Sequence, residues 1–301
     1  MANAIQYAAL FQSNLDLLLV AEATSTFMEA NPNQISYNGG KTIKIADIAL
    51  TGLQDYGRTD GTGFKSGNVT LKWEDYSLTQ DRGVTFSIDS MDVDESANMA
   101  TAATVVSEFG RTQVVPEIDA YRYATIAANA NVQKATPAAL ADGDAFIKAI
   151  DTAVVAMKEI GVKPADLVIV TTPTNANIMG DSKKFQTLKN TSVIAKGGVD
   201  YPVTAYNEIG IQEVPSVCFR DTFTKITTVD GGYDQTAGKP LNFILMKKTG
   251  AAVGIVKADK VRIFAPEVNQ TADSYKIDVR VYHDVIIPKN GAKGIYVHKS
   301  V

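Results

Sequence analysis

The chain has 301 residues, of which 45% are hydrophobic and 21% are charged, and its formal net charge is −4 at pH 7. This length allows about two domains, and the composition is ordinary for a globular protein, which excludes the disordered and fibrous classes. A slightly acidic chain gives no support for a basic nucleic-acid-binding module, although locally basic patches stay possible.

Few residues are available for disulfide, zinc or targeting chemistry. Cys218 is the single cysteine and His283 and His298 are the two histidines, so a disulfide framework is impossible and zinc sites have little material. Lys41 is the first basic residue, whereas secretory and transit signals need positive charge near the start. The most apolar stretch, residues 15–21, is too short to span a membrane. We therefore expect a soluble protein without cofactor, metal or membrane.

Residues 1–40 begin with a helix-like stretch, because apolar residues recur every three or four positions between Ile5 and Leu19. Turn-forming residues follow in Asn31-Pro32-Asn33 and again in Asn38-Gly39-Gly40. This pattern predicts an apolar helical arm with a linker, which packs either on its own core or on a neighbouring chain.

Residues 41–90 predict strands, because apolar and polar residues alternate around Ile43, across Val69 to Trp73 and across Val84 to Ile88. The intervening stretch from Gly52 to Gly67 is glycine-rich and polar and buries little apolar surface by itself. We therefore predict a long β-hairpin with a flexible tip. Since an isolated two-stranded ribbon is marginal in water, another subunit is expected to support it.

The middle of the chain predicts helices and one buried strand. Residues 92–131 carry a helical apolar stripe, and Pro116 either kinks this helix or opens a second one at its first turn. Residues 142–190 predict an α/β segment with a helix that ends at Gly161. The apolar run from Leu167 to Val170 then predicts a strand covered on both faces, and Thr172-Pro173 opens a short helix.

The C-terminal stretch alternates with a period of two from Tyr275 towards Ile287. Residues 288–291 then form a turn, and residues 295–297 return as a second strand. The sequence therefore predicts an antiparallel C-terminal hairpin.

Three motifs with chemical potential have structural explanations. Gly40-Lys41-Thr42 resembles the end of a phosphate-binding loop, but Ile35 replaces the required glycine and a strand follows. The acidic run from Asp89 to Glu95 lacks the glycine of a calcium loop, and helix capping explains it. Cys218 lies between Val217 and Phe219, where an inert buried thiol is expected. The sequence predicts no catalytic, cofactor or metal site.

The predicted hairpin carries residue types that anchor protein interfaces, namely tryptophan and arginine. The alternative interpretation is a half-buried strand with an ordinary solvated face. Our candidate intersubunit contacts are Arg58, Asp60, Lys65, Trp73, Glu74 and Arg82.

Several stretches, in order, resemble the major capsid proteins of tailed bacteriophages with the HK97-type fold. Each stretch alone is weak, and the resemblance rests on their combination across residues 36–298. The stretches are Gly39–Ile45, Thr51–Tyr56, Gly67–Glu74, Leu78–Gly83, Met91–Ser96, Glu108–Arg122, Lys260–Pro266, Arg280–Asp284 and Gly294–His298.

The resemblance implies an α+β capsid fold with five segments. They are an N-terminal arm (1–35), an extended β-hairpin called the E-loop with adjoining peripheral strands (36–90), a peripheral domain with a long spine helix (91–137), an axial domain (138–262), and C-terminal strands that return to the peripheral domain (263–301).

The implied function is structural, and the protein is not an enzyme. The chain is expected to assemble with itself, as hexamers and pentamers, into an icosahedral head in the host cytoplasm and to reside in the virion. Scaffolding and portal proteins are expected partners, and contact with packaged double-stranded DNA would be non-specific. Two alternatives stay open: an encapsulin-type shell that encloses enzymes, and an enzyme that acts through a metal bound by Asp89 to Glu95.

Overall fold

The structure is a computed structural model and describes residues 23–29, 35–36, 42–56, 58, 63–91, 102–196, 199–228, 231–269 and 272–301. The predicted helical arm before residue 23, the phosphate-loop-like Gly40-Lys41 and most of the acidic run 89–95 lie outside these residues. The chain divides into two compact units, Ala30–Leu78 and a larger unit of Met1–Glu29 with Thr79–Val301. No described helix is long and apolar enough to cross a membrane.

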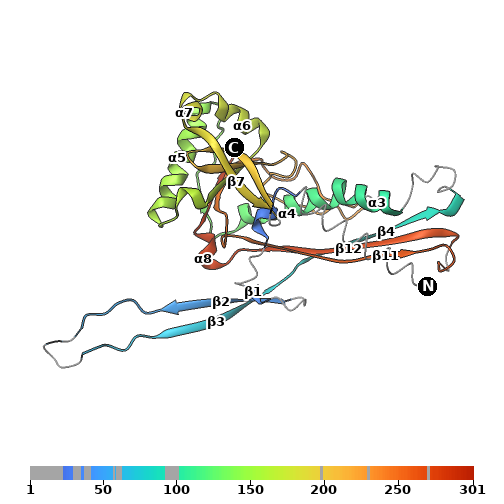
Figure 1. The fold of residues 1–301 in the computed structure, drawn as a ribbon, viewed down its shortest axis with the longest axis horizontal. Helices are drawn as coiled ribbons and strands as arrows, with labels where there is room; N and C mark the ends of the chain where they lie inside the picture. Colours follow the sequence, from blue (N-terminus) through green and yellow to red (C-terminus); the bar gives the residue numbers. More distant parts are fainter. Residues whose placement is uncertain are drawn as a thin grey trace. The chain divides into compact units, whose positions relative to one another are not determined.

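The smaller unit contains the first two predicted strands of residues 41–90 as a hairpin (Figure 1). The third predicted strand, around Val84 to Ile88, does not join this hairpin but pairs within the larger unit. Strands β2 (Thr42–Leu50) and β3 (Val69–Ser77) pair antiparallel along their full length, and the short strand β1 (Ile35–Ser36) adds to the other edge of β2. Residues 51–68 connect β2 to β3, as the glycine-rich composition of this stretch predicts.

A seven-stranded mixed sheet forms one part of the larger unit. Helices α5 (Gly143–Glu159), α6 (Pro173–Gly180) and α7 (Lys183–Leu188) pack on one face of this sheet (Figure 1). A single-turn helix, η3 (Pro164–Asp166), leads into the central strand. In spatial order the strands are β5 (Gln133–Lys134), β13 (Ile295–Lys299), β10 (Leu241–Lys247), β6 (Leu167–Thr171), β9 (Ile209–Glu213), β8 (Val199–Tyr206) and β7 (Lys189–Lys196).

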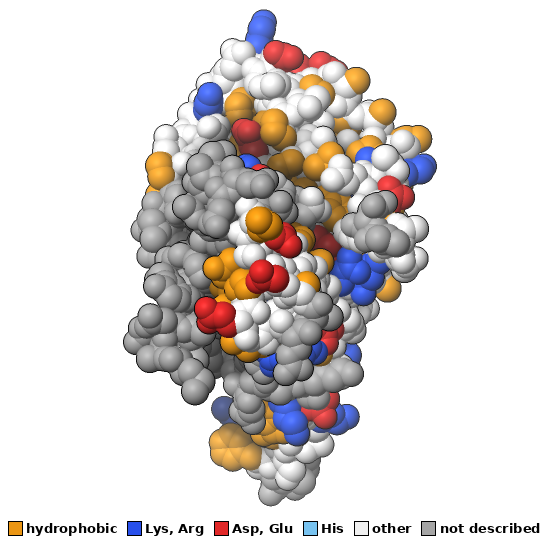
Figure 2. Space-filling view, turned by 90° about the vertical axis from the view of Figure 1, so that its right-hand side faces the viewer, with side chains coloured by type: hydrophobic (Ala, Val, Ile, Leu, Met, Phe, Trp, Pro, Cys, Tyr) orange, Lys and Arg blue, Asp and Glu red, His pale blue; other side chains and the backbone are white. Residues whose placement is uncertain are grey.

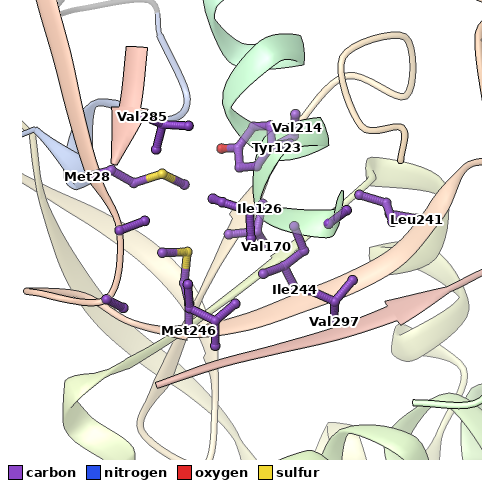
Figure 3. Close-up of a cluster of buried hydrophobic side chains, with 14 of the residues drawn as sticks. Met28, Tyr123, Ile126, Val170, Val214, Leu241, Ile244, Met246, Val285 and Val297 are labelled. Atoms are coloured by element: carbon purple, nitrogen blue, oxygen red, sulfur yellow. The ribbon is translucent and has the colours of Figure 1, made fainter. Parts of the chain in front are cut away.

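The central strand β6 shows why a continuous apolar run was correctly predicted to be a strand. Leu167 and Ile169 face the cluster that contains Phe146 and Phe243, whereas Val168 and Val170 face the opposite cluster (Figure 3). All residues of β6 are buried because both faces of the sheet are covered.

The second sheet of the larger unit has three antiparallel strands, β11 (Val253–Phe264), β12 (Ser274–Ile286) and β4 (Gln80–Asp89). A helical rod lies along this ribbon (Figure 1). It consists of α3 (Ala102–Phe109), a π-helical segment η2 (Gly110–Val114) and α4 (Val115–Ala128). Alternate residues of the strands, among them Ile277 and Val279, pack under this rod.

The rod passes through Pro116 without ending, which resolves the two possibilities that the sequence left open. A regular α-helix would press the proline ring against the carbonyl of Thr112. Here the N–H of Val115 donates to the carbonyl of Gly110, five residues back, so the turn directly before the proline is widened. Residues 102–128 therefore form one rod with a π-helical interruption.

The predicted helices α5 and α6 are confirmed, although Asp142 at the N-cap of α5 makes no side-chain capping hydrogen bond. Helix α5 ends before Gly161, which takes a φ of 82°, a left-handed conformation that glycine adopts without strain. Helix α6 begins at Pro173, and the hydroxyl of Thr172 accepts a hydrogen bond from the N–H of Asn175 at 3.3 Å.

The predicted C-terminal hairpin is wrong. Strand β12 pairs with β11 and β4, whereas β13 lies between β10 and β5 in the other sheet. The connection between them is not a tight turn but includes the short helix α8 (Lys289–Ala292). Ile295 and Val297 are fully buried in the seven-stranded sheet. Burial of these apolar side chains stabilises β13 in this sheet, away from β12.

Candidate intersubunit surface

The hairpin is held together by its strand ladder and by contacts where the connecting loop begins and ends. The N–H of Thr51 donates to the carbonyl of Asn68 at 3.1 Å, and the N–H of Asn68 donates to the Thr51 hydroxyl at 2.8 Å. Across the strands, the side chains of Lys44 and Asp75 approach to 3.8 Å. This pair is exposed, so it contributes little to stability.

One face of β3 presents an apolar row to solvent. Val69, Leu71 and Trp73 alternate along the strand and therefore share a face. Leu71 and Trp73 are each 55% exposed, and Leu50, which pairs with Val69, is also largely exposed. Single exposed apolar residues are common, whereas contiguous exposed apolar patches are a feature of interaction surfaces. We call Leu50, Val69, Leu71 and Trp73 the hairpin apolar face.

The loop adds two aromatic rings to the apolar residues of this unit. Tyr56 and Phe64 pack edge to face with their ring centroids 4.9 Å apart, and Phe64 is nevertheless 91% exposed. The candidate residues Arg58 and Lys65 are exposed in the same loop, and Asp60 lies outside the described residues. The loop thus offers Tyr56 and Arg58, whose residue types are enriched at interface hot spots.

The structure separates two of the candidate contacts from the hairpin apolar face. Glu74 follows Trp73, so it lies on the opposite face of β3, where its carboxylate accepts a hydrogen bond from the Tyr76 hydroxyl at 2.8 Å. Arg82 belongs to β4 in the larger unit. Its guanidinium donates to the Glu117 carboxylate at 2.8 Å and to the carbonyl of Gly232 at 2.9 Å. Arg82 is thus engaged within its own chain.

Sequence reasoning missed Val69, Leu71, Leu50 and Phe64 as surface residues. Their alternation was visible, but alternation shows only that residues share a face and does not show whether that face is covered. Two-stranded ribbons leave a face open because too few elements surround them.

The larger unit contains a groove of about 660 Å³ between β4, β12, the rod and residues 226–228 and 231–232. Its walls are apolar and polar in about equal parts, with Phe86 and Phe109 packed edge to face and Arg82, Glu117 and His283 among the polar groups. Among the described residues, no three histidine, cysteine, aspartate or glutamate side chains gather to hold a metal ion.

The cysteine and histidines lie in settings typical of structural residues. Burial raises the pKa of the Cys218 thiol to about 11, which keeps it protonated, and its sulfur lies 3.6 Å from the Tyr233 hydroxyl. Nδ1 of His298 lies 3.0 Å from the Asn242 amide nitrogen. An inert thiol was predicted for Cys218, and its raised pKa agrees with that expectation.

Charged side chains on the face shown in Figure 2 are mixed in sign. Lysine, arginine, aspartate and glutamate side chains are interspersed there with hydrophobic ones. Among the described residues, this view therefore shows no extended basic patch of the kind that binds nucleic acid with high affinity.

We predict that His283 makes the folded protein less stable in mild acid. Its pKa is lowered to about 3, first by burial and then by the positive charges of Arg122, Lys225 and Arg82. The unfolded state takes up a proton near pH 6.5 and the folded state does not, so stability present above pH 6.5 is lost progressively towards pH 3.

The expected slope of this effect is up to about 1.4 kcal/mol per pH unit for the one proton. Urea unfolding of the unassembled subunit at several pH values between 7.5 and 5 measures it. The His283→Gln variant should lose this contribution, and a variant with the same pH slope as the wild type would contradict the prediction.

The comparisons with known proteins give matches in structure. No protein-family model matches the chain, and no curated protein matches it in sequence. A chain from Mycobacterium phage Che8 superposes with a TM-score of 0.57 at 16% identity and covers 90% of each chain. A chain of the bacteriophage PhiM1 mature capsid gives 0.57 at 14% identity, covering 88% of this chain and 83% of that one.

The chain has the fold of phage capsid subunits. A subunit of the virus-like particle from Pyrococcus furiosus also matches, with a TM-score of 0.54 at 10% identity, covering 97% of this chain and 99% of that chain. At these identities the agreement lies in the fold and not in individual residues.

Proposed function

We propose that this chain is the major capsid protein of a tailed bacteriophage and assembles into an icosahedral head around double-stranded DNA. The observation that carries the proposal is the agreement with phage capsid structures over about nine tenths of both chains. A subunit of this class acts by packing against copies of itself, so it is not an enzyme.

We further propose the HK97-type subdivision for this chain, with the arm at residues 1–35 and the E-loop formed by β2, β3 and the loop between them. The three-stranded sheet with the rod would be the peripheral domain, with the rod as spine helix, and the seven-stranded sheet with its helices the axial domain. In this assignment β11 belongs to the peripheral domain and β13 to the axial domain. The division differs from the sequence expectation, in which the axial domain ended at residue 262 and residues 263–301 all returned to the peripheral domain.

The hairpin apolar face supplies a reason for self-association. Burying a leucine or an aromatic side chain of this size contributes about 1.5–3 kcal/mol, and the chain leaves several such side chains exposed on β3 and its loop. A second copy of the chain is the proposed occupant, because the similar structures are assembled capsids. Closed symmetry repeats the same contact at every subunit, so modest interfaces add up to a stable shell.

Hexamers and pentamers would be built from the same chain, in the host cytoplasm, with scaffolding and portal proteins as partners. Contact with DNA would be non-specific and electrostatic at the inner surface. The second candidate is an encapsulin-type shell that encloses proteins in place of a genome. The match to the virus-like particle of Pyrococcus furiosus over nearly the full length of both chains supports this second candidate.

Electron microscopy of the purified protein tests the proposal. We expect closed shells with five-fold vertices when the protein is produced alone or together with the products of neighbouring genes. Copurified contents separate the candidates, because nucleic acid or a scaffold points to a phage head and a cargo enzyme to the second candidate. A protein that stays monomeric under all these conditions would contradict both.

A further inference from the structure

The chain passes between the two units at Glu29–Ala30 and at Leu78–Thr79. On the larger unit, both crossings lie beside a buried carboxylate. The segment 23–29 is bound to Asp119, and Thr79 is bound to Asp284. Neither carboxylate belongs to the proposed intersubunit contact on the hairpin.

Asp119 binds the first of these segments through four donors. Its carboxylate accepts hydrogen bonds from the backbone N–H groups of Thr24 and Ser25, at 2.9 and 3.2 Å. It also accepts from both hydroxyl groups of these residues, at 2.6 and 2.5 Å. Asp119 is only 2% exposed. A buried carboxylate needs this number of donors, and residues 24 and 25 supply all four of them.

Arg122, one turn later on α4, holds the same segment from another side. Its Nη1 donates to the Ser25 hydroxyl at 2.8 Å and to the Ser25 carbonyl at 3.2 Å. Its Nη2 lies 3.3 Å from the Glu29 carboxylate. The guanidinium is fully buried and lies against the backbone of Gly254 in β11. The Ser25 hydroxyl thus joins the aspartate to the arginine.

Apolar contacts complete this first attachment. The single-turn helix η1 (Thr26–Met28) directs Phe27 and Met28 into the core. Figure 3 shows Met28 beside Tyr123 and Val285. Residues 23–29 are therefore fixed immediately before the chain enters the hairpin unit.

Asp284 holds the chain at the other crossing. Its Oδ2 accepts from the N–H of Thr79 at 2.7 Å and from the Thr79 hydroxyl at 2.9 Å. Its Oδ1 accepts from the Tyr121 hydroxyl at 2.8 Å and from the N–H of Val285 at 2.7 Å. Asp284 is buried as well. Residue 79 is thus fixed as soon as the chain leaves the hairpin unit.

We propose that Asp119 and Asp284 are positioning residues for assembly, which fix on the body the two points where the hairpin unit is attached. The helix α4 serves both points, since Asp119 and Arg122 act at one and Tyr121 at the other. Fixing both ends of a connected unit lowers the conformational entropy that is lost when that unit binds a neighbour. This inference rests on the proposed function, because it takes the hairpin unit as an intersubunit contact.

The test uses hydrogen exchange on the unassembled subunit and shell yield by electron microscopy. In Asp119→Asn, we expect exchange at Thr24 and Ser25 to rise at least tenfold. In Asp284→Asn, we expect the same at Thr79. Shell yield should fall severalfold in both variants, whereas exchange in α5 and β6 should stay as in the wild type. The control is Asp181→Asn, an exposed aspartate, for which neither readout should change.

Two milder variants cover the case in which an aspartate variant fails to fold. Ser25→Ala and Thr79→Val remove one hydroxyl donor each and should shift both readouts in the same direction, to a smaller extent. Unchanged exchange at both attachment points would overturn the inference, and so would faster exchange with full shell yield. A wild-type protein that never forms shells would instead contradict the proposed function. In that case the exchange data would still test whether Asp119 and Asp284 fix the two attachment points.

Discussion

Replacing Leu71 and Trp73 together by aspartate is expected to abolish shell assembly while leaving the subunit folded. Both side chains are more than half exposed on β3, so their removal costs the isolated subunit little. In the assembled shell, the two substitutions would remove the burial of two large apolar side chains and would place two charges in the contact. At about 1.5–3 kcal/mol for each buried side chain, the loss recurs in every subunit of the shell.

The matched control makes the same change in net charge, −2, on the other face of the same strand. Thr70→Asp with Lys72→Gln changes neighbouring positions whose side chains point away from the hairpin apolar face. Size-exclusion chromatography and electron microscopy measure assembly, and circular dichroism confirms folding. Equal loss of assembly in both double variants would show that charge, and not this face, is responsible. Full assembly of the Leu71/Trp73 variant would exclude the face from the contact.

Gly254→Ala is expected to lower the free energy of unfolding by about 3 kcal/mol. A Cβ atom at this position would lie 2.6 Å from Cζ of Arg122, which is closer than any real contact. The guanidinium cannot move aside freely, because it is fully buried and donates to Ser25. The added methyl group must therefore displace either β11 or the segment 23–29.

Urea unfolding of the unassembled subunit measures this change. Gly180→Ala is the matched control, since a Cβ atom at Gly180 meets nothing within 4 Å and the residue ends helix α6. Its effect should stay within about 1 kcal/mol and in the stabilising direction. If the two alanine variants unfold at the same urea concentration, the Arg122 guanidinium leaves room for a methyl group at position 254 and the prediction is wrong.

Predictions from the sequence were most accurate where one local pattern has only one outcome. The run from Leu167 to Val170 has no polar residue, so it had to be covered on both faces. Helix α5 combines a period of 3.6 with Gly161 at its end. Both elements depend on neighbouring residues alone, and both are found as predicted.

Predictions failed where the partner of an element decides its role. Strand β13 alternates in a way that fits a hairpin with β12, and yet it pairs with β10 and β5. An alternating pattern shows which residues share a face, but it does not say which strand lies beside them. The sequence also left open whether the helix continues through Pro116, because the hydrogen bond from Val115 to Gly110 that widens the turn is seen only in the folded chain.

The sequence by itself determined the mixed α and β composition, the hairpin and its loop, and the resemblance to phage capsid proteins, because these rest on local periodicity and on ordered short stretches. The tertiary structure alone decided which faces stay open and which charges are buried. Asp119 and Arg122 look like ordinary polar positions on a helix, and their partners lie more than 90 residues away in the chain. Such pairs are fixed by the cost of burying a charge without a partner, and this cost arises only when the folded chain excludes water.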